Sequence, residues 1–117
     1  MAAVQTAGLR GTSDVKGEIA GLRRIDDTRV AITGWAVDKT ASSPSLTIIA
    51  FAGGRHAMTA VTSGPRKDVA RMLGLPDASA RNVSFEAALE CSPNQNLIVV
   101  AVTADRTYSQ FRSLTCP

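Results

Sequence analysis

The side chain best suited to acid–base chemistry in this 117-residue sequence is His56, its only histidine. A histidine that acts as a general base needs a nucleophile to deprotonate and a carboxylate to orient its ring. The spacing along the chain nominates no residue for either task. We therefore predict that the chain is not an enzyme. The alternative, an enzyme, requires the fold to bring His56 together with a carboxylate and a serine.

The sequence contains few residues that could bind a metal ion or a cofactor. One histidine and two cysteines cannot supply the several ligands of a zinc site. Asp26, Asp27 and Asp38 could hold calcium if one loop end gathered them, but no EF-hand spacing joins them, and aspartate is common in turns. Gly53 and Gly54 lie outside any strand-to-helix phosphate-binding motif. We predict no metal and no cofactor.

The two cysteines, Cys91 and Cys116, each follow a predicted strand. If the last three predicted strands alternate in direction within one sheet, both cysteines reach the same end of that sheet, roughly 9–10 Å apart. A disulfide requires Cα atoms about 4.4–6.8 Å apart, so the loop over 92–96 would have to fold inward. A disulfide would indicate the periplasm or the cell exterior, within a larger exported protein, whereas two free thiols would indicate the cytoplasm.

Aromatic side chains that could stack on a sugar ring are few, at 4% of the residues. Trp35 and Tyr108 are the candidates for ligand binding. Trp35 is out of phase with Val30 and Ile32, so it belongs to the opposite face of its strand. Either that face is covered and Trp35 is a buried structural residue, or the indole is exposed.

Lysine and arginine outnumber aspartate and glutamate by 13 to 10, which gives a net charge of +3. The basic residues are scattered, and the densest group, Arg66, Lys67 and Arg71, is offset by Asp68. Nucleic-acid binding requires a concentrated basic surface, often with aromatic platforms, so we predict no nucleic-acid partner. No stretch approaches the roughly 20 apolar residues of a membrane-spanning helix, and we also predict no membrane insertion.

Short apolar runs separated by turn residues predict the fold that must position these side chains. Their spacing is typical of an all-β protein, an immunoglobulin-like antiparallel β-sandwich of about seven strands. The predicted strands cover 18–23, 29–37, 46–51, 56–61, 82–90, 97–103 and 108–114. Segment 1–16 is predicted as a flexible N-terminal lead-in or linker, and 17–117 as the β-sandwich domain with one hydrophobic core.

Two short elements join these strands. Gly53-Gly54 predicts a two-residue hairpin between the third and fourth strands, because glycine accepts the positive φ of such turns. The spacing of Val69, Met72 and Leu73 predicts one short crossover helix over 65–73, with an irregular loop as the alternative.

The last three strands differ in their patterns. Strand 82–90 alternates strictly, which predicts one face in water and one face on the core. Its core-facing residues are Val83, Phe85, Ala87 and Leu89. Strand 97–103 is apolar on both faces and is predicted to be central and covered, whereas 108–114 is polar enough for an edge strand.

Four groups of residues follow one another in a recognisable order and spacing. They are Gly17 with Ile19, Gly34-Trp35-Ala36 with Asp38, Arg66 with Asp68-Val69, and Val83 with Phe85. Over residues 17–104 this arrangement resembles the small GWA β-sandwich modules of proteobacteria, which read G-x-hydrophobic-D, GWA-x-D, R-x-DVA and GF. The sequence departs from that pattern at Ala20, where an acidic residue often stands, and at Ser84, which replaces the glycine before Phe85.

The resemblance implies an accessory domain, because such modules occur beside glycosyltransferases and in polysaccharide-related and surface proteins. The same residues also have a structural interpretation. Gly34 lets the strand bulge or lets the Trp35 indole lie over the backbone. Arg66, near the start of the predicted helix, could pair with Asp38, and Asp68 with backbone amides. We therefore predict a structural motif that contains Gly34, Trp35, Ala36, Asp38, Arg66, Asp68, Val69 and Phe85.

We expect a non-enzymatic β-sandwich accessory or binding module whose ligand is a carbohydrate or cell-envelope glycan. The alternative is a protein–protein interaction or spacer domain of a larger envelope protein, without a small-molecule site. Such a domain would take a partner by strand addition along 108–114. Exposure of Trp35 and Tyr108 on one patch would favour the glycan, and a flat polar surface with a bare strand edge would favour the protein partner.

Overall fold

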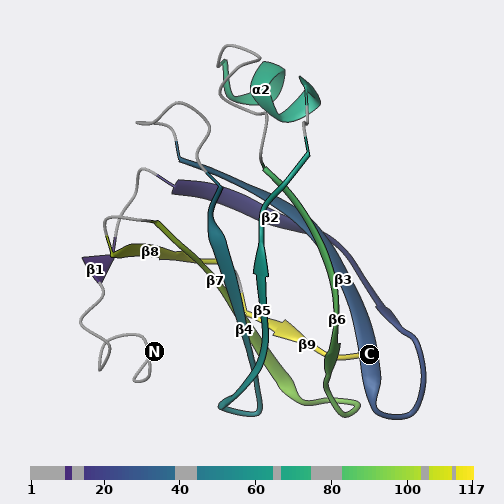
Figure 1. Ribbon diagram of the computed structural model, residues 1–117. Coiled ribbons are helices and arrows are strands. Elements are labelled where there is room, and N and C mark those ends of the chain that lie inside the picture. Colours follow the sequence, from purple (N-terminus) through teal and green to yellow (C-terminus); the bar gives the residue numbers. More distant parts are fainter. Residues whose placement is uncertain are drawn as a thin grey trace.

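Two β-sheets pack face to face in the computed structural model, and one short helix lies at one end of the sandwich (Figure 1). The structure describes residues 10–11, 15–38, 45–64, 67–74, 83–103, 106–111 and 113–117. The three-stranded sheet has the order β2-β3-β6 and consists of β2 (Val15–Arg24), β3 (Arg29–Asp38) and β6 (Ser84–Glu90).

The six-stranded sheet has the order β1-β8-β7-β4-β5, and β9 pairs with β7 off this path. Its strands are β1 (Arg10–Gly11), β4 (Thr47–Ala52), β5 (Arg55–Val61), β7 (Asn96–Val102), β8 (Thr107–Gln110) and β9 (Leu114–Thr115). All strand pairs are antiparallel except β1–β8, which is parallel.

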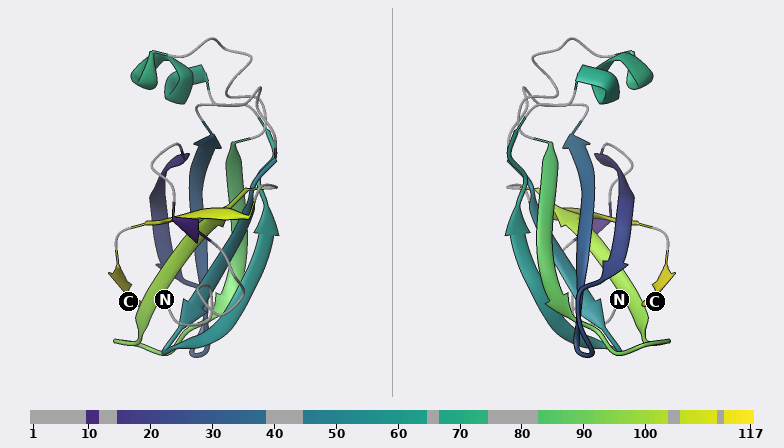
Figure 2. Two further views of the ribbon diagram at one scale, coloured as in Figure 1. Left: turned by 90° about the vertical axis from the view of Figure 1, so that its left-hand side faces the viewer. Right: turned by 90° about the vertical axis from the view of Figure 1, so that its right-hand side faces the viewer.

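This architecture confirms the prediction of an all-β sandwich with one short crossover helix. The helix, α2 (Lys67–Leu73), lies between β5 and β6 in the chain. The chain passes between the sheets after β1, β3, β5 and β6, and the two side views show the resulting layers (Figure 2). The immunoglobulin-like outline stays a prediction.

The β4–β5 hairpin has the turn that its two glycines predict. Gly53 and Gly54 both adopt positive φ, at 58° and 82°, a conformation that glycine reaches without steric cost. The hairpin aligns Ala52 with Arg55. It therefore carries Arg55 and His56 to the end of the sandwich opposite α2 (Figure 1).

The main core lies between the two sheets and consists of inward-facing apolar side chains. β6 largely keeps its predicted phase, since Phe85 and Leu89 are buried and the half-buried Ala87 packs against the core. β7 is covered on both faces, as predicted, because the consecutive residues Val99 and Val100 are both fully buried. Strand periodicity therefore identifies Phe85, Ala87 and Leu89 of this core correctly.

A second, smaller apolar cluster lies where the three-stranded sheet meets α2, and its residues Trp35 and Val37 alternate with the core residue Ala36 and so belong to the outer face of that sheet. It contains Trp35, Val37, Val69 and Val83, with Leu73 packed against it. The prediction of one core that includes Val83 was wrong, because Val83 packs with Trp35 and not with Phe85. The bulky apolar side chains on this outer face must be removed from water, and α2 covers them.

The structure around β8 differs from the predicted edge strand 108–114 and from the predicted lead-in 1–16. The predicted strand 108–114 is split, because Phe111 is buried between β8 and β9 and its ring lies against Gly17. β8 is not the bare edge expected there, since β1 pairs with Thr107 and Tyr108. β1 and the first residues of β2 fall within 1–16, so strand pairing begins inside the predicted lead-in; 1–9 and 12–14 lie outside the described residues.

Candidate functional site

A cleft of about 390 Å³ lies at the end of the sandwich away from α2. Three segments build it: the β2–β3 turn, the start of β5 and the segment around the end of β6. Its polar side chains are those of Thr28, Arg55, His56, Glu90, Ser92 and Gln95. Ala52, Ala57 and Cys91 complete the lining. We call this site the polar cleft.

A disulfide ties the wall of the polar cleft to the C-terminal segment. Cys91 and Cys116 are joined, with an S–S distance of 2.07 Å and a Cα–Cα distance of 6.3 Å. Of the two alternatives for the cysteines, the disulfide is the one formed, but the assumption of a single sheet was wrong, because β6 belongs to the three-stranded sheet and not to the sheet of β7 and β8. The bond therefore links the two sheets, and the separation of roughly 9–10 Å expected within a single sheet does not apply.

Arg24, the last residue of β2, connects the same region through three backbone oxygens. Its Nε donates to Pro117 at 2.6 Å, its Nη1 to Asp26 at 2.9 Å and its Nη2 to Cys91 at 2.7 Å. A guanidinium suits this role because its donors are fixed in a planar fork. It holds together the β2–β3 turn, the end of β6 and the C-terminal segment.

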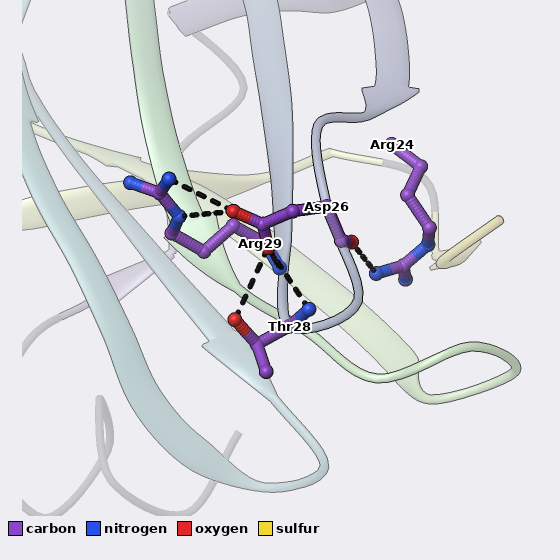
Figure 3. Close-up of polar contacts among 4 residues, drawn as sticks. All are labelled: Arg24, Asp26, Thr28 and Arg29. Atoms are coloured by element: carbon purple, nitrogen blue, oxygen red, sulfur yellow. Dashed lines mark hydrogen bonds and ion pairs between the residues drawn. The ribbon is translucent and has the colours of Figure 1, made fainter.

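Asp26 organises the turn that supplies Thr28 to the polar cleft (Figure 3). Its Oδ1 accepts hydrogen bonds from the Thr28 amide at 3.0 Å, the Thr28 hydroxyl at 3.1 Å and the Arg29 amide at 2.9 Å. Its Oδ2 accepts from Arg29 Nε at 2.9 Å and pairs with Arg29 Nη2 at 2.8 Å. The Thr28 amide, followed by the Arg29 side chain, favours the carboxylate and lowers the pKa of Asp26 from 3.8 to about 2.

The three aspartates considered for calcium do not gather. Asp26 and Asp27 lie in the β2–β3 turn, whereas Asp38 ends β3 at the other end of the sandwich. Within the part of the chain that the structure describes, no group of three or more histidine, cysteine, aspartate or glutamate side chains could hold a metal ion.

His56 is held by two neighbours. Its Nε2 shares a hydrogen bond with the Thr59 hydroxyl at 2.7 Å, and its ring meets Phe51 edge to face, with centroids 6.3 Å apart. His56, Glu90 and Ser92 line one cleft, which is the convergence that an enzyme would require. Among the described residues, however, no hydrogen bond joins His56 to either of them, and the imidazole is bonded instead to the Thr59 hydroxyl.

The two aromatic residues predicted to bind a ligand do not form a common patch. Trp35 is 6% exposed and packs against α2 on the three-stranded sheet. Tyr108 is half-buried on β8, in the other sheet. They cannot stack on one sugar ring together, so the arrangement expected to favour a glycan at these residues is not formed. Trp35 is instead a buried structural residue, which is the first of the two alternatives that its strand phase left open.

The motif residue Gly34 and the β2 residue Gly17 both make room for aromatic rings. A Cβ at Gly34 would collide with the backbone oxygen of Glu18 and with the Phe85 ring, and a Cβ at Gly17 would collide with the Phe111 ring. The two phenylalanine rings lie 6.3 Å apart and 32° from coplanar. The glycines are therefore positions that the packing of Phe85 and Phe111 requires.

The remaining motif residues that the structure describes lie on β3 and on α2. Ala36 belongs to the main core, and Val69 to the cluster against α2. Asp38 is 8% exposed at the end of β3, and Asp68 is exposed in the first turn of α2. Arg66 lies outside the described residues, and so does its predicted pairing with Asp38.

A comparison with solved structures finds a protein domain with a similar fold. The chain is similar to the sensor domain of the anti-sigma factor RsgI4 of Pseudobacteroides cellulosolvens, with a TM-score of 0.50 and 10% sequence identity over 91% of this chain and 97% of that chain. At that identity the likeness concerns the fold alone. No family model and no curated protein sequence matches the chain, so the resemblance to GWA modules stays a prediction. No helix among the described residues is long and apolar enough to cross a membrane.

Proposed function

We propose that this chain is a non-enzymatic binding module that holds a carbohydrate or cell-envelope glycan in the polar cleft. The observation that carries the proposal is the convergence of six polar side chains from three separate segments on one cleft. Hydroxyl, amide, imidazole, guanidinium and carboxylate groups together can donate to and accept from the many hydroxyls of a sugar. The volume of about 390 Å³ falls among those of small-molecule sites.

The frame of the polar cleft supports recognition. Arg24 and the disulfide fix Cys91, and the Ser92 amide donates to Gln95 Oε1 at 2.9 Å. The Cys116 amide donates to the backbone oxygen of Gln95 at 3.0 Å. A site that is already ordered loses little conformational freedom when a ligand binds. Binding without chemistry is also favoured because, among the described residues, no hydrogen bond joins His56 to Glu90 or Ser92 of the same cleft.

We further infer that the domain works in the periplasm or outside the cell, as part of a larger exported protein. The Cys91–Cys116 disulfide supports this location, because the cytoplasm of most cells keeps thiols reduced. The resemblance to GWA accessory modules and the fold shared with a sensor domain support a recognition role.

A protein-interaction domain is the second candidate function. It is favoured by β2, which pairs only with β3 in the part of the chain that the structure describes. Strand addition along 108–114 loses support, because β1 already pairs with β8.

An NMR titration of the ¹⁵N-labelled protein with bacterial oligosaccharides and polysaccharide fragments tests the glycan proposal. We expect saturable shifts of the His56, Ser92 and Gln95 amides, weakened by His56→Ala and Gln95→Ala. The matched control is Arg71→Ala, on the exposed side of α2, which should bind as the parent does. Absence of shifts at millimolar sugar, or shifts confined to Trp35 and α2, would refute binding in the polar cleft.

A further inference from the structure

The edge of the three-stranded sheet formed by β2 has features that point to a binding partner. This strand is ten residues long and is the first of the order β2-β3-β6, so its backbone is paired on one side only among the described residues. Its register with β3 shifts between Ile19 and Gly21. The edge is therefore regular over Val15–Ile19 before the shift and over Gly21–Arg24 after it, and the first of these parts is the longer.

A second cleft, of about 350 Å³, follows the Val15–Ile19 part of the edge. Trp35, Met72 and Leu73 line it on the outer face of the sheet, and Phe111 lines it on the core side. Residues 16–19 of β2 lie between them. A cleft with apolar walls on both sides of an edge strand has the shape that an added strand would fill. Met72, which is 62% exposed, is the most exposed large hydrophobic residue among those described.

The charges on this edge are self-complementary. Lys16 and Glu18 are exposed, are two residues apart and share the outer face, one on each side of Gly17. If two copies pair antiparallel about a two-fold axis at Gly17, Lys16 of each copy lies opposite Glu18 of the other. The same register places Val15 opposite Ile19 on the core side. Opposite charges that face one another across a strand pair are attractive, and like charges are repulsive.

We propose that the β2 edge binds a second copy of this chain, antiparallel and centred on Gly17. The two three-stranded sheets then form one continuous sheet, and Met72 of each copy lies at the junction between them. A lysine on an exposed edge normally prevents pairing, but in this register it meets a glutamate. A two-fold interface uses one patch twice, which the order Lys16-Gly17-Glu18 satisfies without any other partner.

Sedimentation equilibrium of the oxidised protein, from micromolar to millimolar concentration, tests the proposal with a charge-swap series. The parent should dimerise reversibly. Lys16→Glu or Glu18→Lys alone replaces both attractive pairs by repulsive ones and should weaken association by about tenfold or more. The double variant Lys16→Glu/Glu18→Lys should restore it. An equimolar mixture of the two single variants should form a heterodimer, because all their facing charges are opposite.

Two results would overturn the proposal: a parent that stays monomeric at millimolar concentration, or a double variant that associates no better than the single ones. Both substituted side chains are exposed, so unchanged thermal unfolding of the variants separates loss of association from loss of folding. Glycan titration of the monomeric variants remains a separate experiment, since the polar cleft lies at the other end of the sandwich.

Discussion

The guanidinium of Arg24 donates a hydrogen bond to the backbone oxygen of Cys91 at 2.7 Å, so a side chain of the edge strand β2 holds the residue from which the disulfide starts. The same side chain reaches Pro117, next to the other cysteine. The Cys91–Cys116 disulfide and the Arg24 guanidinium thus both join the end of β6 to the C-terminal segment. The stability of the polar cleft should depend on both.

Arg24→Ala should lower the free energy of unfolding by about 1–3 kcal/mol, because it leaves backbone oxygens of Cys91 and Pro117 without their charged donor. Arg24→Lys should recover little of this loss, since an ammonium lacks the planar fork of donors. Urea unfolding of the oxidised protein measures both effects. Arg23→Ala is the matched control, because Arg23 is the exposed neighbour on the same strand. Equal losses for the two alanine variants would contradict the role assigned to Arg24.

The turn held by Asp26 should weaken in acid. Its pKa is lowered from 3.8 to about 2 in the folded protein, so folding favours the carboxylate over the acid. The stabilisation is fully present above the unfolded pKa and is lost as the pH falls through about 2. Asp26→Asn should therefore be less stable than the parent at neutral pH, and the difference should shrink as the pH falls from 3.8 toward 2. Unfolding at stepped pH tests this, with Asp27→Asn as the control.

Gly34→Ala should destabilise the fold by about 1–3 kcal/mol, because the new methyl group meets the backbone of Glu18 as well as the Phe85 ring. A ring can shift, but a paired strand cannot move away without losing hydrogen bonds. Gly11→Ala is the control, since a Cβ there would meet no atom of the described residues within 4 Å, its chain neighbours aside. Thermal unfolding of both variants measures the loss of stability that each methyl group causes. A tolerated Gly34→Ala would show that the motif glycine does not serve packing.

Val69→Ala should loosen α2 and expose Trp35, because both residues belong to the cluster on the outer face of the three-stranded sheet. The expected signs are stronger acrylamide quenching and a red shift of the single tryptophan's fluorescence. Deleting buried methyl groups should cost about 1–3 kcal/mol of stability. Arg71→Ala, on the exposed side of the helix, should leave the fluorescence unchanged. An unchanged spectrum in Val69→Ala would mean that α2 does not cover the indole.

Periodicity and turn chemistry predict most of the strands here, the β4–β5 hairpin and the helix. They do not reveal which sheet a strand joins, because alternation reports the buried face and not the neighbour. β6 was therefore expected in one sheet with β7 and β8 although it pairs with β3. β1, with two residues, is too short to show any pattern.

Only part of the polar cleft could be anticipated. His56 stood out as the only histidine, and the glycine turn before Arg55 places both residues at one end of the sandwich. Thr28, Glu90 and Gln95 come from distant segments, and only the tertiary fold brings them beside His56. The burial of Trp35 depends likewise on a helix that follows it by more than thirty positions in the chain.

The Cys91–Cys116 bridge also determines how the domain bears tension. A pull applied at Pro117 reaches Cys116 first and passes through the sulfur atoms to Cys91, beside the three-stranded sheet. β9, which has two residues paired with β7, is then spared from being peeled away. In the oxidised protein, a tether attached behind the last strand would load the three-stranded sheet through the disulfide, whereas reduction would leave the two-residue β9 and the hydrogen bonds of Cys116 and Pro117 to carry the force.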